Sequence, residues 1–169
     1  MDITQLILDD HHEQRRLFAM IDEIDPQDIA SLAAIWKRLS TFLEVHAETE
    51  ERFFYPQLLK TGRQAGQGEE VEEEALDAIK DHNEIRDAVA AVGKETVGTR
   101  AWIDAVAAAN KANGDHMAEE EREGLTSFRR EASLALRHQL AVSFAAYENK
   151  HVDGVKPVDK DPEKWVAAH

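Results

Sequence analysis

Residues 46–52 read His-Ala-Glu-Thr-Glu-Glu-Arg and residues 116–122 read His-Met-Ala-Glu-Glu-Glu-Arg, so the pattern H-x-x-x-E-E-R occurs twice, 70 residues apart. A second pattern, D-H-x-E-x-R, precedes each copy, at residues 10–15 and 81–86. Because two linked patterns recur at nearly equal spacing, the chain contains an internal duplication. Each half is predicted to be a helical hairpin, with one histidine on its first helix and a His-x-x-x-Glu pair on its second.

The residues around these patterns favour helices throughout. Ala, Leu, Glu, Arg and Lys dominate long stretches in which apolar residues recur about every 3.6 positions, and alternating β-branched runs are almost absent. We therefore expect an all-α protein: an antiparallel up-and-down four-helix bundle with a short fifth C-terminal helix and an irregular tail. We expect residues 1–148 to form the bundle and residues 149–169 to form the tail. The predicted helices cover about Ile3–Ile24, Pro26–Tyr55, Glu69–Lys94, Thr99–Gly124 and Arg130–Glu148.

Local signals suggest where these helices begin and end. Asp2 is predicted to cap the first helix, and Asp25 the second, with Pro26 at the first helical position, where its missing N–H costs nothing. Pro56 is predicted to break the second helix. Residues 61–68, which include three glycines, are predicted to form the loop between the two halves.

The composition excludes several classes of protein. The 169 residues are the size of one domain, and the absence of cysteine excludes disulfides, zinc–thiolate sites and thiol catalysis. The net charge of −14 repels nucleic acid and anionic membrane surfaces, so we expect neither as a partner. The sequence shows no basic and apolar leader and no membrane-length apolar run, so we expect a cytoplasmic protein.

Six side chains are candidate metal ligands. Residues four apart lie on one face of a helix, about 6 Å apart along its axis, so each His-x-x-x-Glu pair can hold one ion. All four histidines of the patterns share a helix face with apolar residues, and burying the two glutamates there without compensation would cost several kcal/mol each. A single histidine on an apolar stripe is usually a hydrogen-bonded core residue, and the alternative is therefore a metal-free bundle. Four such histidines with two spaced glutamates favour a two-metal site instead, with His11, His46, Glu50, His82, His116 and Glu120 as ligands.

Several neighbouring residues have more than one interpretation. Glu51 and Glu121 are offset from the ligand face; hydrogen bonds to imidazole N–H groups and solvated salt bridges are both possible, and we favour salt bridges. Tyr55 could donate a hydrogen bond towards the metals, but we favour a packing role at a helix end. Arg15 and Arg86 each follow a ligand histidine by four, and the sequence leaves buried ion pairs and surface contacts equally open. The remaining histidines, which we expect on the surface or in the tail, are His12, His138, His151 and His169.

The order of these motifs resembles that of the hemerythrin-like HHE cation-binding family over roughly residues 3–147. The matching elements are Asp10-His11, the first His-x-x-x-Glu-Glu followed by Phe54-Tyr55-Pro56, then Asp81-His82 and the second His-x-x-x-Glu-Glu. The resemblance implies an antiparallel four-helix bundle around two iron ions joined by an oxo or hydroxo bridge, with zinc or manganese as possible substitutes. It also implies the same six ligands, with Glu50 and Glu120 bridging the irons.

Two departures from the oxygen-carrying members of that family limit what the resemblance implies. Those carriers have a further histidine four residues after the third-helix histidine, where this chain has Arg86, and an aspartate five residues after the fourth-helix histidine, where it has Glu121. Fewer protein ligands leave coordination positions for small molecules, which argues against reversible oxygen carriage.

We therefore expect a di-iron protein that binds or reacts with O2, peroxide or NO, in sensing, scavenging or iron handling. The alternative is a catalase- or peroxidase-like enzyme acting on hydrogen peroxide, and the sequence leaves open whether the protein is an enzyme. The expected partner is a small diatomic molecule or peroxide. Repair of damaged iron centres ranks last, because the members of the family associated with it carry a cysteine-bearing extension that this chain lacks.

Overall fold

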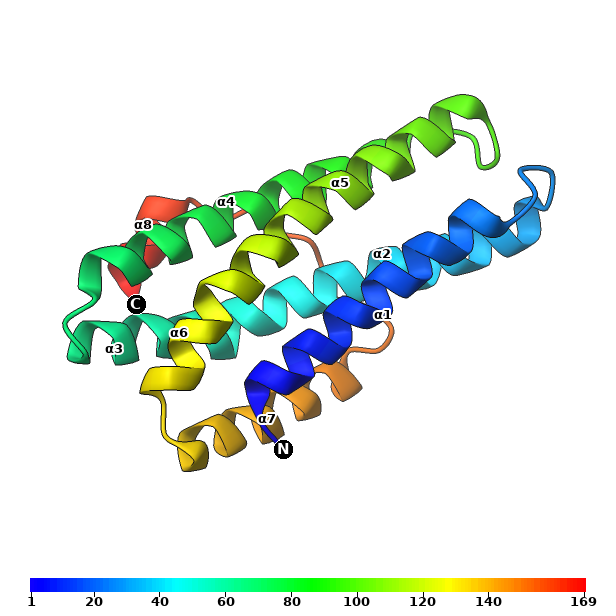
Figure 1. Cartoon of the computed structure of the whole chain (residues 1–169). Coiled ribbons are helices and arrows are strands. Elements are labelled where there is room, and N and C mark those ends of the chain that lie inside the picture. The colour runs from blue at the N-terminus through cyan, green and yellow to red at the C-terminus, as the bar shows by residue number, and fades with distance from the viewer.

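Four long helices form the frame of the molecule (Figure 1). The computed structural model describes all 169 residues, and every regular element in it is helical, as predicted. The first two long helices form one antiparallel hairpin and the last two form another, and the turns of both hairpins lie at the same end of the bundle (Figure 1). These helices are α1 (Ile3–Glu23), α2 (Ile29–Thr49), α4 (Gly68–Val92) and α5 (Arg100–Arg122). None of the helices has both the length and the apolar character that a membrane span requires.

The sequence predicted the N-terminal cap of α1 correctly but not that of α2. Asp2 caps α1 as expected, and its side chain accepts a hydrogen bond from the backbone N–H of Thr4. The prediction that α2 starts at Pro26 was wrong, because Asp28 is the cap and accepts from the N–H of Ser31. Asp25 instead accepts from the N–H of Gln27 and closes the turn that precedes the helix.

Pro56 does not break the helix, so the prediction that the second helix ends there was wrong. Residues Glu50–Phe54 form a π-helical segment, η1, and α3 (Tyr55–Gln64) continues from it. The N–H of Tyr55 donates to the carbonyl of Glu50, five residues earlier. A proline breaks an α-helix because it has no N–H to donate to the carbonyl four residues earlier. In the π segment the hydrogen bonds reach five residues back, so the pairing of the carbonyls differs and helix continues past Pro56. The predicted loop at 61–68 is accordingly shorter, because helix extends to Gln64.

The C-terminal third is more regular than the sequence predicted. The predicted segment Arg130–Glu148 corresponds to α7 (Leu134–Lys150), which starts later and is capped by Ser133, and a further helix that was not predicted, α6 (Gly124–Glu131), precedes it. Helix α7 packs against α1 and α2. The tail is irregular only from residue 151 to 161, after which α8 (Pro162–Ala168) packs against α4. Val166 is buried there, so burial of apolar surface holds in place a segment whose composition suggested an irregular tail.

The core is divided into two apolar clusters by a polar layer. The cluster near the hairpin turns, which we call the tip cluster, includes Leu17, Phe18, Leu32, Trp36 and Trp102. The cluster at the other end, the base cluster, includes Ile3, Ile7, Phe54, Leu58 and Phe144. Along each long helix and the segment that continues from it, the predicted ligands fall between residues of the two clusters. The apolar packing on both sides thus fixes four helices around a group of polar side chains.

Candidate metal centre

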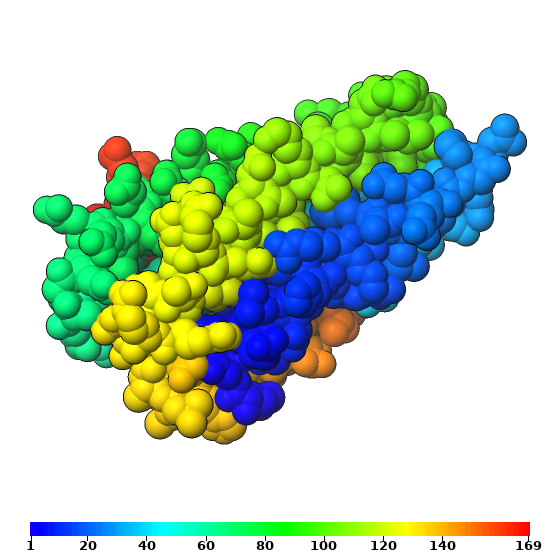
Figure 2. All heavy atoms as spheres, in the orientation of Figure 1, coloured from blue at the N-terminus to red at the C-terminus, as the bar shows by residue number.

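All six predicted ligand side chains meet in the polar layer. Each is at most 4% exposed, and together they come from α1, α2, η1, α4 and α5. On the face shown in Figure 2, the atoms of α5 and α6 lie against those of α1 and cover the interior. The side chains that meet are those of His11, His46, Glu50, His82, His116 and Glu120.

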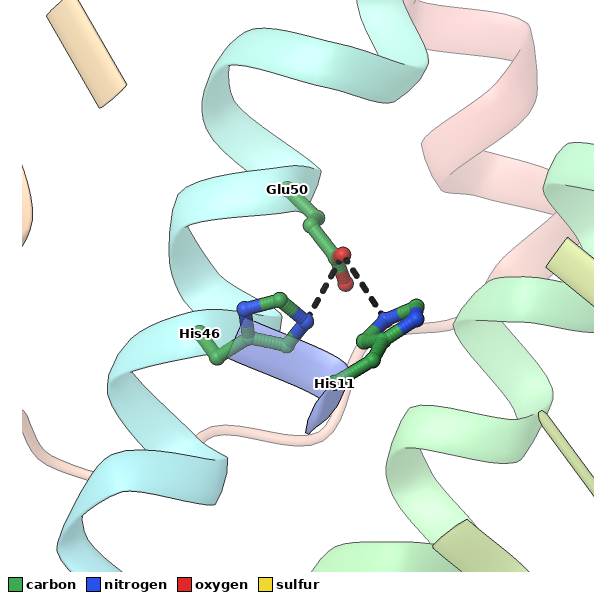
Figure 3. Close-up of side chains that lie close together, drawn as sticks. All are labelled: His11, His46 and Glu50. Atoms are coloured by element: carbon green, nitrogen blue, oxygen red, sulfur yellow. Dashed lines mark ion pairs between the residues drawn. The ribbon is translucent and has the colours of Figure 1, made fainter. Parts of the chain in front are cut away.

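One group of three could hold a metal ion within the first half of the chain. Oε1 of Glu50 lies 2.8 Å from Nε2 of His46 and 3.8 Å from Nε2 of His11 (Figure 3). The ligand atoms of these three residues all lie within 4.8 Å of one another. The two imidazoles approach the carboxylate from different helices, α1 and α2, as a shared ion requires.

A second group uses the same glutamate and the histidines of the other half. Oε2 of Glu50 lies 3.3 Å from Nε2 of His82, and Nε2 of His82 lies 3.1 Å from Nε2 of His116. Glu50, His82 and His116 again place their ligand atoms within 4.8 Å of one another. One oxygen of Glu50 therefore faces the histidines of each group.

Glu120 lies beside the first group and is held by a tyrosine. Its Oε2 is 3.2 Å from Nε2 of His11, and its Oε1 accepts a hydrogen bond of 2.6 Å from the hydroxyl of Tyr55. The carboxylate is thus directed towards the histidine of α1, whereas the spacing had suggested that it shares an ion with His116 on its own helix.

The atoms at the centre lack hydrogen-bond partners. Nε2 of His11, Nε2 of His46, both oxygens of Glu50 and Oε2 of Glu120 are all buried without a hydrogen bond of acceptable geometry, although they face one another closely. An unpaired buried polar atom costs about 1–3 kcal/mol, and a buried charge costs more. Convergent lone pairs of imidazole and carboxylate are the donor set that a divalent transition metal binds. The residues present therefore fit a metal ion.

A carboxylate faces the outer nitrogen of every imidazole. The distances from Nδ1 are 2.9 Å for His11, 3.2 Å for His46, 2.8 Å for His82 and 3.6 Å for His116. A carboxylate at Nδ1 orients the ring and leaves Nε2 free for a metal. The four carboxylates, in the same order, belong to Glu121, Asp10, Glu51 and Asp81.

These contacts correct two preferences drawn from the sequence. Glu51 and Glu121 were favoured as solvated salt bridges, but each contacts a histidine of the centre, and Glu51 is only 2% exposed. The two arginines of the D-H-x-E-x-R patterns, left open by the sequence, bind these same carboxylates. Arg15 lies 2.8 Å from Glu121, and Arg86 lies 3.0 Å from Glu51.

The carboxylates connect the two halves in a crossed pattern. Asp10 and Asp81 each face the histidine on the second helix of their own hairpin. The glutamates of the second helices, in contrast, each face the first histidine of the other hairpin. Neither hairpin therefore orients both of its imidazoles by itself.

A family model described as the hemerythrin HHE cation-binding domain matches residues 2–125. The chain belongs to this family. The match confirms the resemblance inferred from the sequence motifs, and it covers all six candidate ligands of the HHE domain. Neither the search of curated proteins nor the search of solved structures found a match.

The electrostatics of the HHE domain are dominated by the pairing of imidazole and carboxylate. Burial disfavours the charged form of His46, but Glu50 and Asp10 outweigh it and raise the histidine's pKa well above its usual range. In the same way, burial is outweighed by Glu50 and Glu51 at His82, whose pKa is raised to about 9. Burial would raise the pKa of Glu51, but His82, Arg86 and Lys160 lower it to about 2. The carboxylate of Glu51 is thus held ionised beside the imidazole of His82.

The HHE domain contains polar contacts that the sequence had not favoured or had not indicated. Tyr55, expected to pack at a helix end, is fully buried and hydrogen-bonded to Glu120. Gln14 accepts a 2.9 Å hydrogen bond from Asn113, and both are buried in the polar layer on the side of the tip cluster. Asp10 and Asp81 carried a visible signal, because an aspartate directly precedes the first histidine in both halves.

Proposed function

We propose that this HHE domain binds two iron ions and that the centre binds or reacts with O2, peroxide or NO, in sensing, scavenging or iron handling. The observation that carries the proposal is Glu50, whose two oxygens face two separate histidine pairs and have no other partner. Two imidazoles and a shared carboxylate suit iron, and also zinc or manganese. Iron bound here would supply redox chemistry and open coordination positions for a small molecule.

A cavity beside the centre supports a small ligand. It has a volume of about 140 Å³ and lies between α2 and α4, with His82 in its wall. Half of the lining residues are apolar, including Leu43, Ile85 and Val89, and the paired charges of Glu44 and Arg86 lie in the same wall. A cavity of this size admits a small molecule such as O2, NO or peroxide. The proposal also keeps the expected cytoplasmic location and the absence of nucleic acid and membranes as partners.

Metal analysis of purified variants tests the ligand assignment. We expect about two irons per chain in the parent and a loss of about tenfold or more in affinity in Glu50→Ala and His116→Ala, since each removes one of few ligands. His138→Ala is the matched control, because His138 is exposed and its side chain forms hydrogen bonds only with the N-terminal residue.

The same preparations separate the competing functions. Unchanged iron in both ligand variants would contradict the assignment, and zinc as the sole metal would contradict redox chemistry. Steady turnover of hydrogen peroxide by the iron-loaded parent would identify an enzyme. A stable spectral change with NO or O2, without turnover, would identify a binding or sensing protein.

A further inference from the structure

The segment between α7 and α8 crosses the outside of the metal centre. We call residues 151–161 the C-terminal strap; it lies outside residues 2–125, which the family model matches. In Figure 1 it runs as an orange trace from α7 past α2 towards α8, which lies along α4. Its far end is fixed by Asn83, whose side chain donates to the carbonyl of Lys160 at 2.7 Å and accepts from the Lys160 N–H at 3.1 Å. Asn83 directly follows His82, so the strap is attached beside a candidate ligand.

The side chain of Lys160 reaches inward from this attachment. Its ammonium group donates to Oε2 of Glu51 and, at 2.7 Å, to Oε2 of Glu48. The other oxygen of Glu51 lies 2.8 Å from Nδ1 of His82 and accepts a hydrogen bond of 3.0 Å from Arg86. A continuous chain of contacts therefore leads from Lys160 through Glu51 to His82.

The charge of Lys160 acts on a buried carboxylate. The Glu51 side chain is 1% exposed, so little water screens the ammonium that binds it. A carboxylate at Nδ1 draws the imidazole proton towards itself and makes the ring a stronger electron donor to a metal. An ammonium on the second oxygen of that carboxylate weakens this effect. Arg86 contributes in the same direction from the neighbouring turn of α4.

The surroundings of Lys160 differ from those of an ordinary surface lysine. Its side chain is 23% exposed, whereas that of Lys164, a few residues later, is 84% exposed and pairs only with the nearby Asp161. The contact between Lys160 and Glu51 joins residues 109 positions apart, and both ends are fixed by further hydrogen bonds.

We propose that Lys160 is a positioning residue of the metal centre: it orients Glu51 and limits how strongly Glu51 polarises His82. The C-terminal strap then belongs to the site, because it holds Lys160 against Glu51. The effect on a bound metal rests on the proposed function, whereas the link from Lys160 through Glu51 to the His82 ring is made by the chain's own side chains and can be tested without metal.

The test compares three variants of the full chain. Lys160→Met keeps the apolar stem and removes the charge, Lys160→Arg restores a charge, and Lys164→Met removes a neighbouring exposed charge as the control. In the metal-free protein, the ring-nitrogen NMR signals of His82 should shift in Lys160→Met, return towards the parent in Lys160→Arg and stay unchanged in Lys164→Met. In the iron-loaded protein, the midpoint potential should fall in Lys160→Met, because His82 becomes the stronger donor.

The outcomes distinguish this inference from the proposed function. His82 signals that are identical in the parent and Lys160→Met, or equally shifted in Lys164→Met, would overturn the inference. A fall in potential that Lys160→Arg does not reverse would also overturn it, because loss of packing alone would then explain the shift. A parent that binds no iron contradicts the proposed function, and the NMR comparison then still decides whether Lys160 acts on His82.

Discussion

Each imidazole of the centre faces a carboxylate at its outer nitrogen, whereas the two candidate-ligand carboxylates, Glu50 and Glu120, are held by fewer contacts. Glu50 has no hydrogen bond at all, whereas Glu120 receives one from Tyr55. Burial, together with the nearby carboxylates of Glu120 and Glu50, raises the pKa of the Tyr55 hydroxyl well above its usual range, so the hydroxyl stays protonated and remains a donor. Tyr55 therefore determines where one oxygen of Glu120 points, and so leaves the other free towards His11.

Removing the hydroxyl of Tyr55 should weaken both the fold and the centre. In Tyr55→Phe, the ring still fills the base cluster, but the buried Glu120 carboxylate loses its donor, which we expect to cost about 1–3 kcal/mol in the free energy of unfolding. Urea denaturation measures this loss, and a metal titration should show weaker binding. Tyr147→Phe removes a hydroxyl from a half-buried ring stacked on His151 and serves as the control. Equal stability of the two variants would refute this role for Tyr55.

The sequence could nominate the candidate ligands because the evidence for them was local, and the structure brings their side chains together. His46 and Glu50 are four apart on one helix, and the same spacing recurs at His116. Long-range contacts gave no such evidence: nothing in the spacing of Glu51 indicates His82 or Lys160 as its partners. The crossed pairing depends on which helices become neighbours, and only the folded bundle fixes that.

At the scale of the helical elements, the π segment explains the position of Tyr55. In a regular α-helix, a residue five positions after Glu50 would lie about 140° around the axis from it. The wider turn at Glu50–Phe54 rotates less per residue, so Tyr55 returns towards the side of the helix that faces the centre. Pro56 was a correct signal of irregular helix geometry, but the irregularity proved to be a π turn followed by more helix.

The packing of α3 on α4 depends on a glycine. A Cβ built on Gly62 would lie 2.3 Å from Cγ1 and 3.0 Å from Cβ of Val71, so rotating the valine side chain would not remove the clash. We expect Gly62→Ala to destabilise the protein by about 1–3 kcal/mol through overpacking. Gly114→Ala is the matched control, because a Cβ there meets nothing within 4 Å and should stabilise α5 by about 0.5–1 kcal/mol.

Thermal unfolding of the two glycine variants checks both predictions: a lower midpoint for Gly62→Ala and a higher one for Gly114→Ala. A midpoint for Gly62→Ala at or above that of the parent would show that α3 moves away from α4 at no cost. The comparison is informative because both substitutions add the same methyl group to a helix, and only the neighbouring atoms differ.

At the scale of the whole molecule, two apolar clusters enclose a layer that is unfavourable without a cation. The general layout could be predicted from the sequence, because helix formers dominate and apolar residues recur with a period near 3.6. The C-terminal end of the chain could not be predicted, since helix α8 is stabilised by its packing on α4, and its own composition gives only a weak signal.

Metal removal should therefore lower the stability of the entire bundle. A bound ion stabilises the folded state by about 2.7 kcal/mol when its free concentration is 100 times the dissociation constant. We expect a chelator to lower the midpoint of thermal unfolding of the metal-loaded parent and to leave Glu50→Ala almost unchanged, because that variant retains little metal. An equal response of the two proteins would contradict this expectation.

The crossed carboxylates have a consequence for the origin of the fold. Glu51 of the first hairpin serves the second, and Glu121 of the second serves the first. A single hairpin of this type would hold one imidazole in place and leave the other unsupported until it met a second copy around a twofold axis. The repeated sequence has the form of such a symmetric pair joined into one polypeptide, in which each partner has kept the residue that the other needs.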